Sequence, residues 1–205
     1  MPTMGIVIRT IFNKKRQDFA IKKQGYTMNE IKLERKFVDI LVDANNNLAI
    51  FSMAKNPDKI EGDVWSPIWL PAQNPIELRA PYTAEELSVA LARGINAWES
   101  GEVLPLGKSS LAEFYYQIKG FKKATLGTKY VNLGWCPGWG PGRGKYVWIE
   151  LPMNRNKGHA YMGIEFKNLP DDADWMDFAN TLLELLDMDL TKTKTYQVYK
   201  SKLNK

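Results

Sequence analysis

Short runs of apolar and β-branched residues, each followed by a polar or turn-forming cluster, indicate where strands lie. Strands are predicted at 5–12, 37–42, 48–53, 76–79, 130–133, 145–151, 161–166 and 195–199, the last as an edge strand. The polar cluster 43–47, Asp-Ala-Asn-Asn-Asn, suits a tight turn, so 37–42 and 48–53 should form a hairpin. Five prolines between 57 and 81 exclude an intact helix or central strand from that stretch.

Apolar residues at helical spacing predict three helices. The first begins after Thr83, because Glu86 lies three residues on and completes a capping box. A shorter helix over 110–118 begins in the same way, with Ser110 and Glu113. The third starts within 170–174. Its apolar face is predicted to be Trp175, Phe178, Ala179, Leu182, Leu185 and Leu186, and that of the first helix Leu87, Ala90, Leu91, Ile95 and Trp98.

This order of elements predicts an α+β fold, with mostly antiparallel sheet strands and about three amphipathic helices. A hairpin, a short strand and a helix occur in that order at 37–99 and again at 130–188. We therefore expect one α+β domain over residues 1–205, or its division into two related ββ(β)α halves, 1–103 and 104–205. Gene duplication and independent origin both explain such a pattern.

The reactive side chains are few. The single cysteine, Cys136, and the single histidine, His159, exclude an internal disulfide and a Cys/His zinc site among these 205 residues. The apolar runs are much shorter than the roughly 20 residues of a membrane helix, and no signal-peptide pattern opens the chain. We expect a cytoplasmic protein with no cofactor, no metal and no membrane partner.

Charge is distributed unevenly along the chain. Residues 1–36 carry a net charge of +6, residues 166–190 carry −6 and the tail 191–205 carries +5, which leaves +5 overall. The basic ends support one alternative function, a nucleic-acid-binding module that uses Lys14, Lys15 and Arg16. A solvated basic terminus explains the same charge.

The segment 134–144 contains seven glycines and prolines in eleven positions. Its glycines do not have the G-x-G-x-x-G spacing of a phosphate-binding loop, and no Gly-Lys-Ser/Thr follows them. The segment also leads into a strand instead of a helix. Because tryptophan and arginine are enriched at binding hot spots, Trp135, Trp139 and Arg143 are predicted to form a recognition loop. In the alternative interpretation the segment is a hairpin connection whose tryptophans pack on the sheet.

Four aspartates, Asp171, Asp172, Asp174 and Asp177, lie in the first turns of the third helix. They carry more negative charge than capping requires. One hypothesis makes them an acidic surface that attracts a basic partner, and the other a solvated helix face.

No catalytic residue is predicted. His159 is expected in a loop, and the sequence identifies no partner that would orient it. Glu150 and Glu165 lie on predicted strands and suggest a carboxylate pair, although solvent-facing alternation explains both. The aromatic segment 65–71 is expected to cover a sheet edge or the core. The sequence thus favours a protein that is not an enzyme.

Four stretches, taken in order, support a family resemblance. They are 83–91 (TAEELSVAL) in the first helix, 121–124 (FKKA) entering a strand region, the strand 144–149 (GKYVWI), and 171–174 (DDAD) before the last helix. Over 82–187 their order and residue classes resemble the proteobacterial immunity proteins of contact-dependent growth inhibition systems. The resemblance implies a cytoplasmic protein that binds the C-terminal domain of a delivered toxin, often a nuclease, and occludes its active site. It implies no particular contact residue, because such surfaces are matched to individual toxins.

Overall fold

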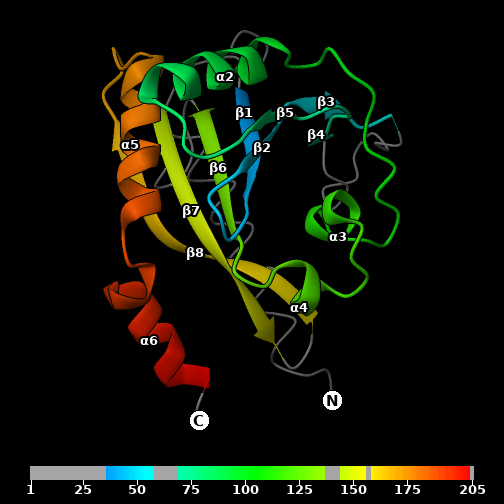
Figure 1. Ribbon diagram of the computed structural model, residues 1–205, viewed down its shortest axis with the longest axis vertical. Helices are drawn as coiled ribbons and strands as arrows, with labels where there is room; N and C mark the ends of the chain where they lie inside the picture. Colours follow the sequence, from blue (N-terminus) through cyan, green and yellow to red (C-terminus); the bar gives the residue numbers. More distant parts are fainter. Residues whose placement is uncertain (1–35, 58–68, 137–143, 156–157, 204–205) are drawn as a thin grey trace, which may run out of the picture. The chain divides into compact units, whose positions relative to one another are not determined.

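A computed structural model describes residues 36–57, 69–136, 144–155 and 158–203, all within one compact unit, Glu34–Lys205. The fold is α+β, as predicted from the sequence. In the described part of the chain, five strands are followed by three α-helices, and then three more strands by two more α-helices (Figure 1). The predicted strand 5–12 and the basic residues Lys14, Lys15 and Arg16 lie outside the described residues.

Six strands form one antiparallel sheet in the order β5-β2-β1-β6-β7-β8, and β3 pairs with β4 in a small second sheet. The strands are β1 Lys36–Val42, β2 Leu48–Phe51, β3 Met53–Lys55, β4 Trp69–Pro71, β5 Ile76–Leu78, β6 Lys129–Cys136, β7 Gly144–Arg155 and β8 Gly158–Leu169. The helices are α2 Ala84–Asn96, α3 Leu111–Tyr116, α4 Phe121–Ala124, α5 Trp175–Asp187 and α6 Lys194–Leu203, with a 3₁₀ turn, η1 Leu190–Lys192, before α6.

The predicted hairpin is present, and its turn is stabilised by the side chain of Asp43. The carboxylate oxygen Oδ1 of Asp43 accepts hydrogen bonds from the backbone N–H of Asn45 at 2.8 Å and of Asn47 at 2.9 Å. Asn46 adopts a left-handed conformation with φ of 61°, which asparagine tolerates better than most residues. The polar cluster therefore reverses the chain and sets the β1–β2 register.

The strand order is symmetric about the central pair β1 and β6. On one side β1 is followed outward by β2 and β5, and on the other side β6 is followed by β7 and β8. Helix α2 follows β5 in the chain, helix α5 follows β8, and the two helices pack against each other. The sheet thus contains two groups of strands, each followed in the chain by a helix on the same face. The division of the domain into two related halves stays a prediction, and their origin stays open.

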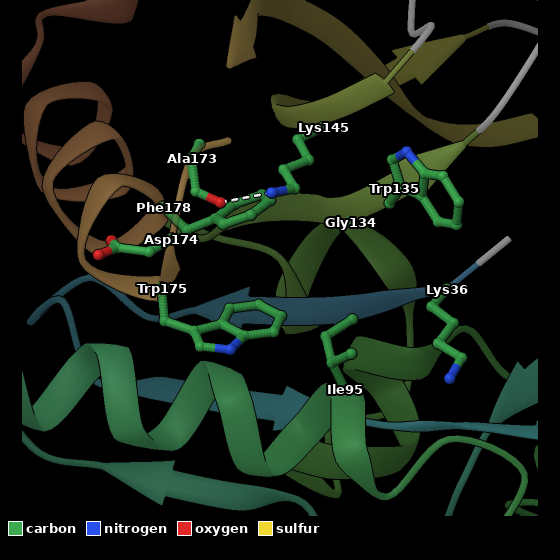
Figure 2. A pocket seen from close by; sticks show the side chains of 9 residues that line it. All are labelled: Lys36, Ile95, Gly134, Trp135, Lys145, Ala173, Asp174, Trp175 and Phe178. Atoms are coloured by element: carbon green, nitrogen blue, oxygen red, sulfur yellow. Dashed lines mark hydrogen bonds between the residues drawn. The ribbon is translucent and has the colours of Figure 1, made fainter. Parts of the chain in front are cut away.

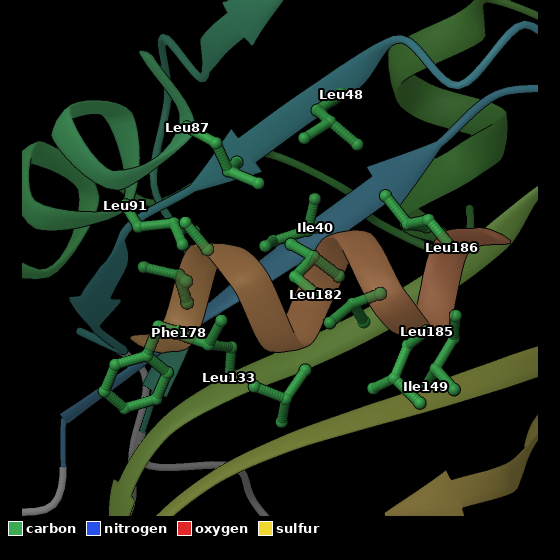
Figure 3. Close-up of a cluster of buried hydrophobic side chains, with 14 of the residues drawn as sticks. Ile40, Leu48, Leu87, Leu91, Leu133, Ile149, Phe178, Leu182, Leu185 and Leu186 are labelled. Atoms are coloured by element: carbon green, nitrogen blue, oxygen red, sulfur yellow. The ribbon is translucent and has the colours of Figure 1, made fainter. Parts of the chain in front are cut away.

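The main core lies between the sheet and the helices α2 and α5, which cover the same face (Figure 1). Figure 3 shows Leu182 and Leu185 of α5 above Leu133 of β6 and Ile149 of β7. All four side chains are fully buried. Replacing one buried leucine of this kind by alanine costs about 2–5 kcal/mol, so these positions determine much of the stability.

A second apolar cluster covers part of the opposite face, under α3 and α4. Its members are Leu41, Ala49 and Phe51 from the sheet and Leu104, Leu111, Ala112 and Ala124 from the covering segments. Because successive strand residues point to opposite faces, β1 contributes Ile40 to the main core and its neighbour Leu41 to this second cluster.

Some predicted elements are wrong in type or in extent. The segment 195–199, predicted as a strand, belongs to helix α6, which follows η1 directly. The Thr193 hydroxyl accepts a hydrogen bond from the backbone N–H of Tyr196 at 3.3 Å, so a local polar contact favours the helix. His159 lies at the start of β8 and not in a loop, because β7 and β8 pair beyond the predicted strand ends.

Three other differences concern helix boundaries. The third helix begins later than predicted, with Asp174 as N-cap. Residues 121–124, expected to enter a strand, form the short helix α4. Trp98 lies beyond the end of α2, where its ring contacts Phe37 at 5.1 Å and Trp69 at 4.8 Å between ring centroids. The aromatic segment 65–71 therefore contributes Trp69 to packing, as expected, while Trp65 lies outside the described residues.

Candidate functional site

Trp135 lies near the end of β6, on the face of the sheet that α5 covers. It pairs with Lys36 of β1 on one side and with Lys145 of β7 on the other. Directly paired residues share a face, so these three side chains point the same way. Trp135 remains 40% exposed, which is unusual for so large an apolar side chain.

These three side chains border a hollow of about 310 Å³ at the start of α5, which we call the α5 pocket. Figure 2 shows the indole rings of Trp135 and Trp175 at opposite ends of the group. The remaining lining residues are Ile95, Gly134, Ala173, Asp174 and Phe178. Trp175 stacks on Phe178 with ring centroids 5.4 Å apart, so one wall is aromatic and held in place by the helix.

The start of α5 is fixed by a capping box. The Asp174 carboxylate accepts hydrogen bonds from the backbone N–H groups of Met176 at 2.8 Å and Asp177 at 3.0 Å. In return, the Asp177 carboxylate accepts from the backbone N–H of Asp174 at 2.9 Å. Two of the four predicted aspartates therefore stabilise the helix as well as carrying charge.

The other two aspartates lie in the turn that connects β8 to α5. All four aspartates, which we call the acidic cluster (Asp171, Asp172, Asp174 and Asp177), are exposed to solvent. Oδ1 of Asp171 lies only 3.1 Å from the position that a Cβ atom would occupy on Gly144, the first residue of β7. The acidic cluster is therefore adjacent to the strand that leaves the glycine-rich segment.

The structure thus brings two separately predicted surfaces together. Trp135 from the glycine-rich segment and Asp174 from the acidic cluster line the same pocket. Trp139 and Arg143 lie outside the described residues, so their part in this surface stays a prediction. Sequence alone did not reveal the link, because it depends on α5 packing beside the ends of β6 and β7.

Glu150 and Glu165 do not form a carboxylate pair. Glu165 pairs with Ile149, whose side chain is buried under the helices, whereas Glu150 is the next residue along β7 and points to the opposite face. The register shift between Ile149 and Glu150 places Gly163 opposite Glu150. The sheet therefore separates the two carboxylates.

The carboxylate that acts on Glu150 is instead that of Asp39 in β1. Burial, and to a smaller extent the negative charge of Asp39, together raise the pKa of Glu150 from 4.5 to about 7. Asp39 is only 7% exposed, and its Oδ1 accepts a hydrogen bond from Nδ2 of Asn132 at 2.8 Å. The Tyr146 hydroxyl donates to Oδ1 of Asn132 at 2.6 Å, so one polar chain crosses β1, β6 and β7.

This polar cluster was missed at the sequence level. Its signal was present, because Asp39 interrupts the apolar strand 37–42 and Glu150 interrupts the strand 145–151. Asp39 was given no role, and solvent-facing alternation explained Glu150. The structure instead buries Asp39 and partly buries Glu150, on the face under α3 and α4.

Comparison with known proteins identifies no relative. No protein-family model matches the chain, and no curated protein matches it closely enough to indicate a relationship. The α5 pocket and the Asp39 cluster therefore have to be interpreted from their own chemistry.

No group of three or more histidine, cysteine, aspartate or glutamate side chains in the described part of the chain is arranged to hold a metal ion. None of the described helices combines the length and the apolar character needed to cross a bilayer.

Proposed function

We propose that this protein binds and neutralises a toxin domain, as the immunity proteins of contact-dependent growth inhibition systems do. The observation that carries the proposal is that the exposed ring of Trp135 and the acidic start of α5 border one pocket. The binding surface would consist of this pocket and the acidic cluster beside it.

The pocket supplies an anchor point for the partner. Interfaces obtain most of their affinity from a few aromatic or arginine side chains that insert into well-packed pockets. A hollow of about 310 Å³ between Trp135 and Trp175 suits one apolar side chain of the partner. The walls are pre-formed, because Trp175 stacks on Phe178 and the capping box fixes the helix start.

The acidic cluster supplies the charge complementarity. A nuclease carries a basic surface, because it must contact the phosphates of its substrate. Four exposed aspartates at the start of α5 would attract such a surface, speed the encounter and compete with nucleic acid for the same contacts. Binding there would occlude the active site of the toxin.

This mechanism requires no catalysis by the chain itself. Inhibition by occlusion needs a rigid, complementary surface, and neither a cofactor nor a metal takes part. The protein would act in the cytoplasm, where a delivered toxin domain reaches its substrate.

The proposal expects a toxin gene immediately upstream of the gene for this chain, and the direct test uses the C-terminal domain of the protein encoded there. We expect co-expression to restore growth of cells that produce the toxin domain, and the purified proteins to form a stoichiometric complex measurable by isothermal titration calorimetry. Absence of both protection and complex formation would show that the proposal is wrong.

The alternative function, nucleic-acid binding through Lys14, Lys15 and Arg16, rests on sequence alone. It predicts binding to RNA or DNA that weakens steeply with salt and is lost when the three residues are neutralised. Lack of binding at low salt would remove this alternative.

A further inference from the structure

The edge strand β5 and the helix α2 border an open groove. Its volume is about 400 Å³, and it shares no lining residue with the α5 pocket. Ile76, Leu78 and Ala90 supply apolar walls, and Val89 adds an apolar side chain that is 60% exposed. The remaining lining residues are Glu77, Glu85, Glu86 and Arg93. We call this hollow the β5 groove.

One side of β5 is available for further strand pairing. The strand lies at the end of the six-stranded sheet, and within the described residues it pairs only with β2. An extended segment of another chain can pair with the backbone N–H and C=O groups on the outer side of such a strand. Pro75 and Pro81 flank β5 and keep this edge short, so the side chains of the segment must supply much of the affinity.

The alternation of side chains along β5 determines what such a segment carries. Ile76 and Leu78 pack against the main core beneath α2, whereas Glu77 points to the opposite face. There the Glu77 carboxylate accepts a hydrogen bond from the Tyr115 hydroxyl at 2.7 Å. A strand added beside β5 follows the same alternation. Its apolar side chains would therefore enter the β5 groove, and the residue between them would lie beside Glu77.

Charge indicates which kind of residue lies beside Glu77. Three of the eight lining residues are glutamates and one is an arginine, so their formal net charge is −2. All three glutamates are exposed to solvent. A carboxylate can accept more than one hydrogen bond, so the bond from Tyr115 leaves Glu77 able to accept another. Opposite charges on neighbouring strands stabilise their pairing, and a lysine or arginine therefore fits beside Glu77.

The same charge disfavours a second copy of this chain as the occupant. Two β5 strands paired about a two-fold axis would bring equivalent residues of the two copies together. Glu77 is the middle residue of β5, so the two Glu77 carboxylates would approach each other across the new strand pair. Like charges in such positions destabilise the pairing, whereas a basic segment of a different protein meets no such repulsion.

We propose that β5 pairs with an extended segment of a partner protein in which apolar and basic side chains alternate. The apolar side chains fill the β5 groove, and a lysine or arginine lies beside Glu77. This interaction does not depend on the proposed neutralisation of a toxin, because it uses neither the α5 pocket nor the acidic cluster.

The test uses the full chain and two short peptides, one of alternating valine and lysine and the other of alternating valine and glutamate. We expect the lysine peptide to bind saturably in isothermal titration calorimetry and to shift the amide NMR signals of β5 and of the first half of α2. The glutamate peptide should bind about tenfold more weakly, since its carboxylates meet those of the groove. Equal affinity for the two peptides would overturn the proposal.

N-methylated versions of the lysine peptide test whether it binds as a strand. The N–H groups of alternate strand residues point to the same side, so pairing with β5 uses either those of the valines or those of the lysines. Methylation of one set should abolish binding, and methylation of the other should leave the affinity within about threefold. Retention of binding by both methylated peptides would show that no strand pairing takes place.

Variants with altered charge locate the site. Glu77→Lys should weaken binding of the lysine peptide by about tenfold and strengthen binding of the glutamate peptide. Glu77→Gln, which retains an oxygen able to accept from Tyr115, should have an intermediate effect. The matched control is Glu165→Lys on β8, the other edge strand of the same sheet, and it should leave both affinities unchanged. An unchanged peptide preference in Glu77→Lys protein that has the circular dichroism spectrum of the wild type would contradict the assignment.

Analytical ultracentrifugation tests the second copy as an occupant. A dimer that dissociates when the lysine peptide binds would show that β5 pairs with itself, and it would overturn the choice of partner. A monomer that binds the peptide supports the proposal. Failure of the toxin domain to bind would contradict only the proposed neutralising function, because the peptide experiments do not involve that domain.

Discussion

Nζ of Lys145 donates a hydrogen bond to the backbone carbonyl oxygen of Ala173 at 2.5 Å (Figure 2). This bond joins the start of β7 to the turn that leads into α5, across 28 positions of the chain. It therefore fixes the distance between the glycine-rich segment and the acidic cluster. The two parts of the α5 pocket are held together by a contact that no local sequence pattern contains.

Replacing Trp135 by alanine should weaken the binding of the toxin domain strongly. The exposed indole borders the α5 pocket, and removal of an aromatic hot-spot residue costs about 2 kcal/mol or more, or at least thirtyfold in Kd. Isothermal titration calorimetry with the purified toxin domain measures this change.

Trp148→Ala is the matched control for this experiment. Trp148 is 38% exposed, close to the 40% of Trp135, but it lies on the opposite face of the sheet. The toxin affinity of this variant should stay within about threefold of the wild type. An equal loss in both variants would show that the α5 pocket has no special part in binding.

Neutralising Asp171 and Asp172 together, as Asp171→Asn/Asp172→Asn, should slow association with a basic partner. Both side chains are exposed and neither belongs to the capping box of α5, so the loss is one of steering and not of stability. We expect a decrease of about tenfold in the association rate at low salt, and a much smaller decrease at high salt. Stopped-flow or surface plasmon resonance measurements provide the rate.

The control removes two exposed acids elsewhere, in the variant Glu85→Gln/Glu99→Gln. Its association rate should remain near that of the wild type. If both double variants slow association equally, net charge and not the acidic cluster determines the encounter.

Asp174→Ala should destabilise the fold by about 1 kcal/mol. The alanine side chain cannot accept the hydrogen bonds from Met176 and Asp177, so two N–H groups at the start of α5 lose their partner. Urea unfolding followed by circular dichroism measures the free energy. Asp174→Ser, which retains a capping oxygen, should recover most of it, and failure to do so would indicate that the charge matters more than the cap.

Glu150 should make the protein less stable as the pH rises. Its pKa is raised from 4.5 to about 7 in the folded state, first by burial and then by Asp39. Between these two values the folded chain holds a proton that the unfolded chain has lost, so the free energy of unfolding decreases from pH 4.5 to pH 7. We expect about 1 kcal/mol, well below the full value of the shift, because the side chain is partly exposed and water screens its charge.

The free energy of unfolding of Glu150→Gln should not show this decrease. Relative to its own value at pH 4, it should therefore be higher at pH 8 than that of the wild type. Thermal unfolding at a series of pH values measures the difference. Glu165→Gln should keep the pH dependence that Glu150 contributes. An unchanged pH profile in Glu150→Gln would mean that burial does not perturb this carboxyl group.

Local signals in the sequence were sufficient for most of the fold. The capping boxes at Thr83 and Ser110 and the turn at Asp43 are present because their side chains satisfy backbone groups a few positions away. Strand ends and the segment 195–199 were less predictable. Pairing between β7 and β8 extends those strands beyond their apolar runs. In 195–199 the half-buried Tyr196 and Tyr199 are three positions apart, which is helical spacing.

The sites could be predicted only in part. Trp135 and Asp174 were predicted as members of separate surfaces, but their shared pocket depends on α5 packing beside β6. Asp39 and Glu150 are far apart in the chain and come within electrostatic range because β1 and β7 flank the same strand, β6. Strand order is a long-range property, and it is set by the whole core and not by either segment.

Asp39 also helps to determine the register in which β1 pairs with β6. A slip of one residue between β1 and β6 would turn the Asp39 carboxylate towards the main core under α2 and α5 and move Ile40 to the opposite face. Burying that charge among leucines would cost several kcal/mol, so the misaligned pairing is strongly disfavoured. The buried carboxylate of Asp39 thus selects the correct register of the central strand pair over its nearest alternative.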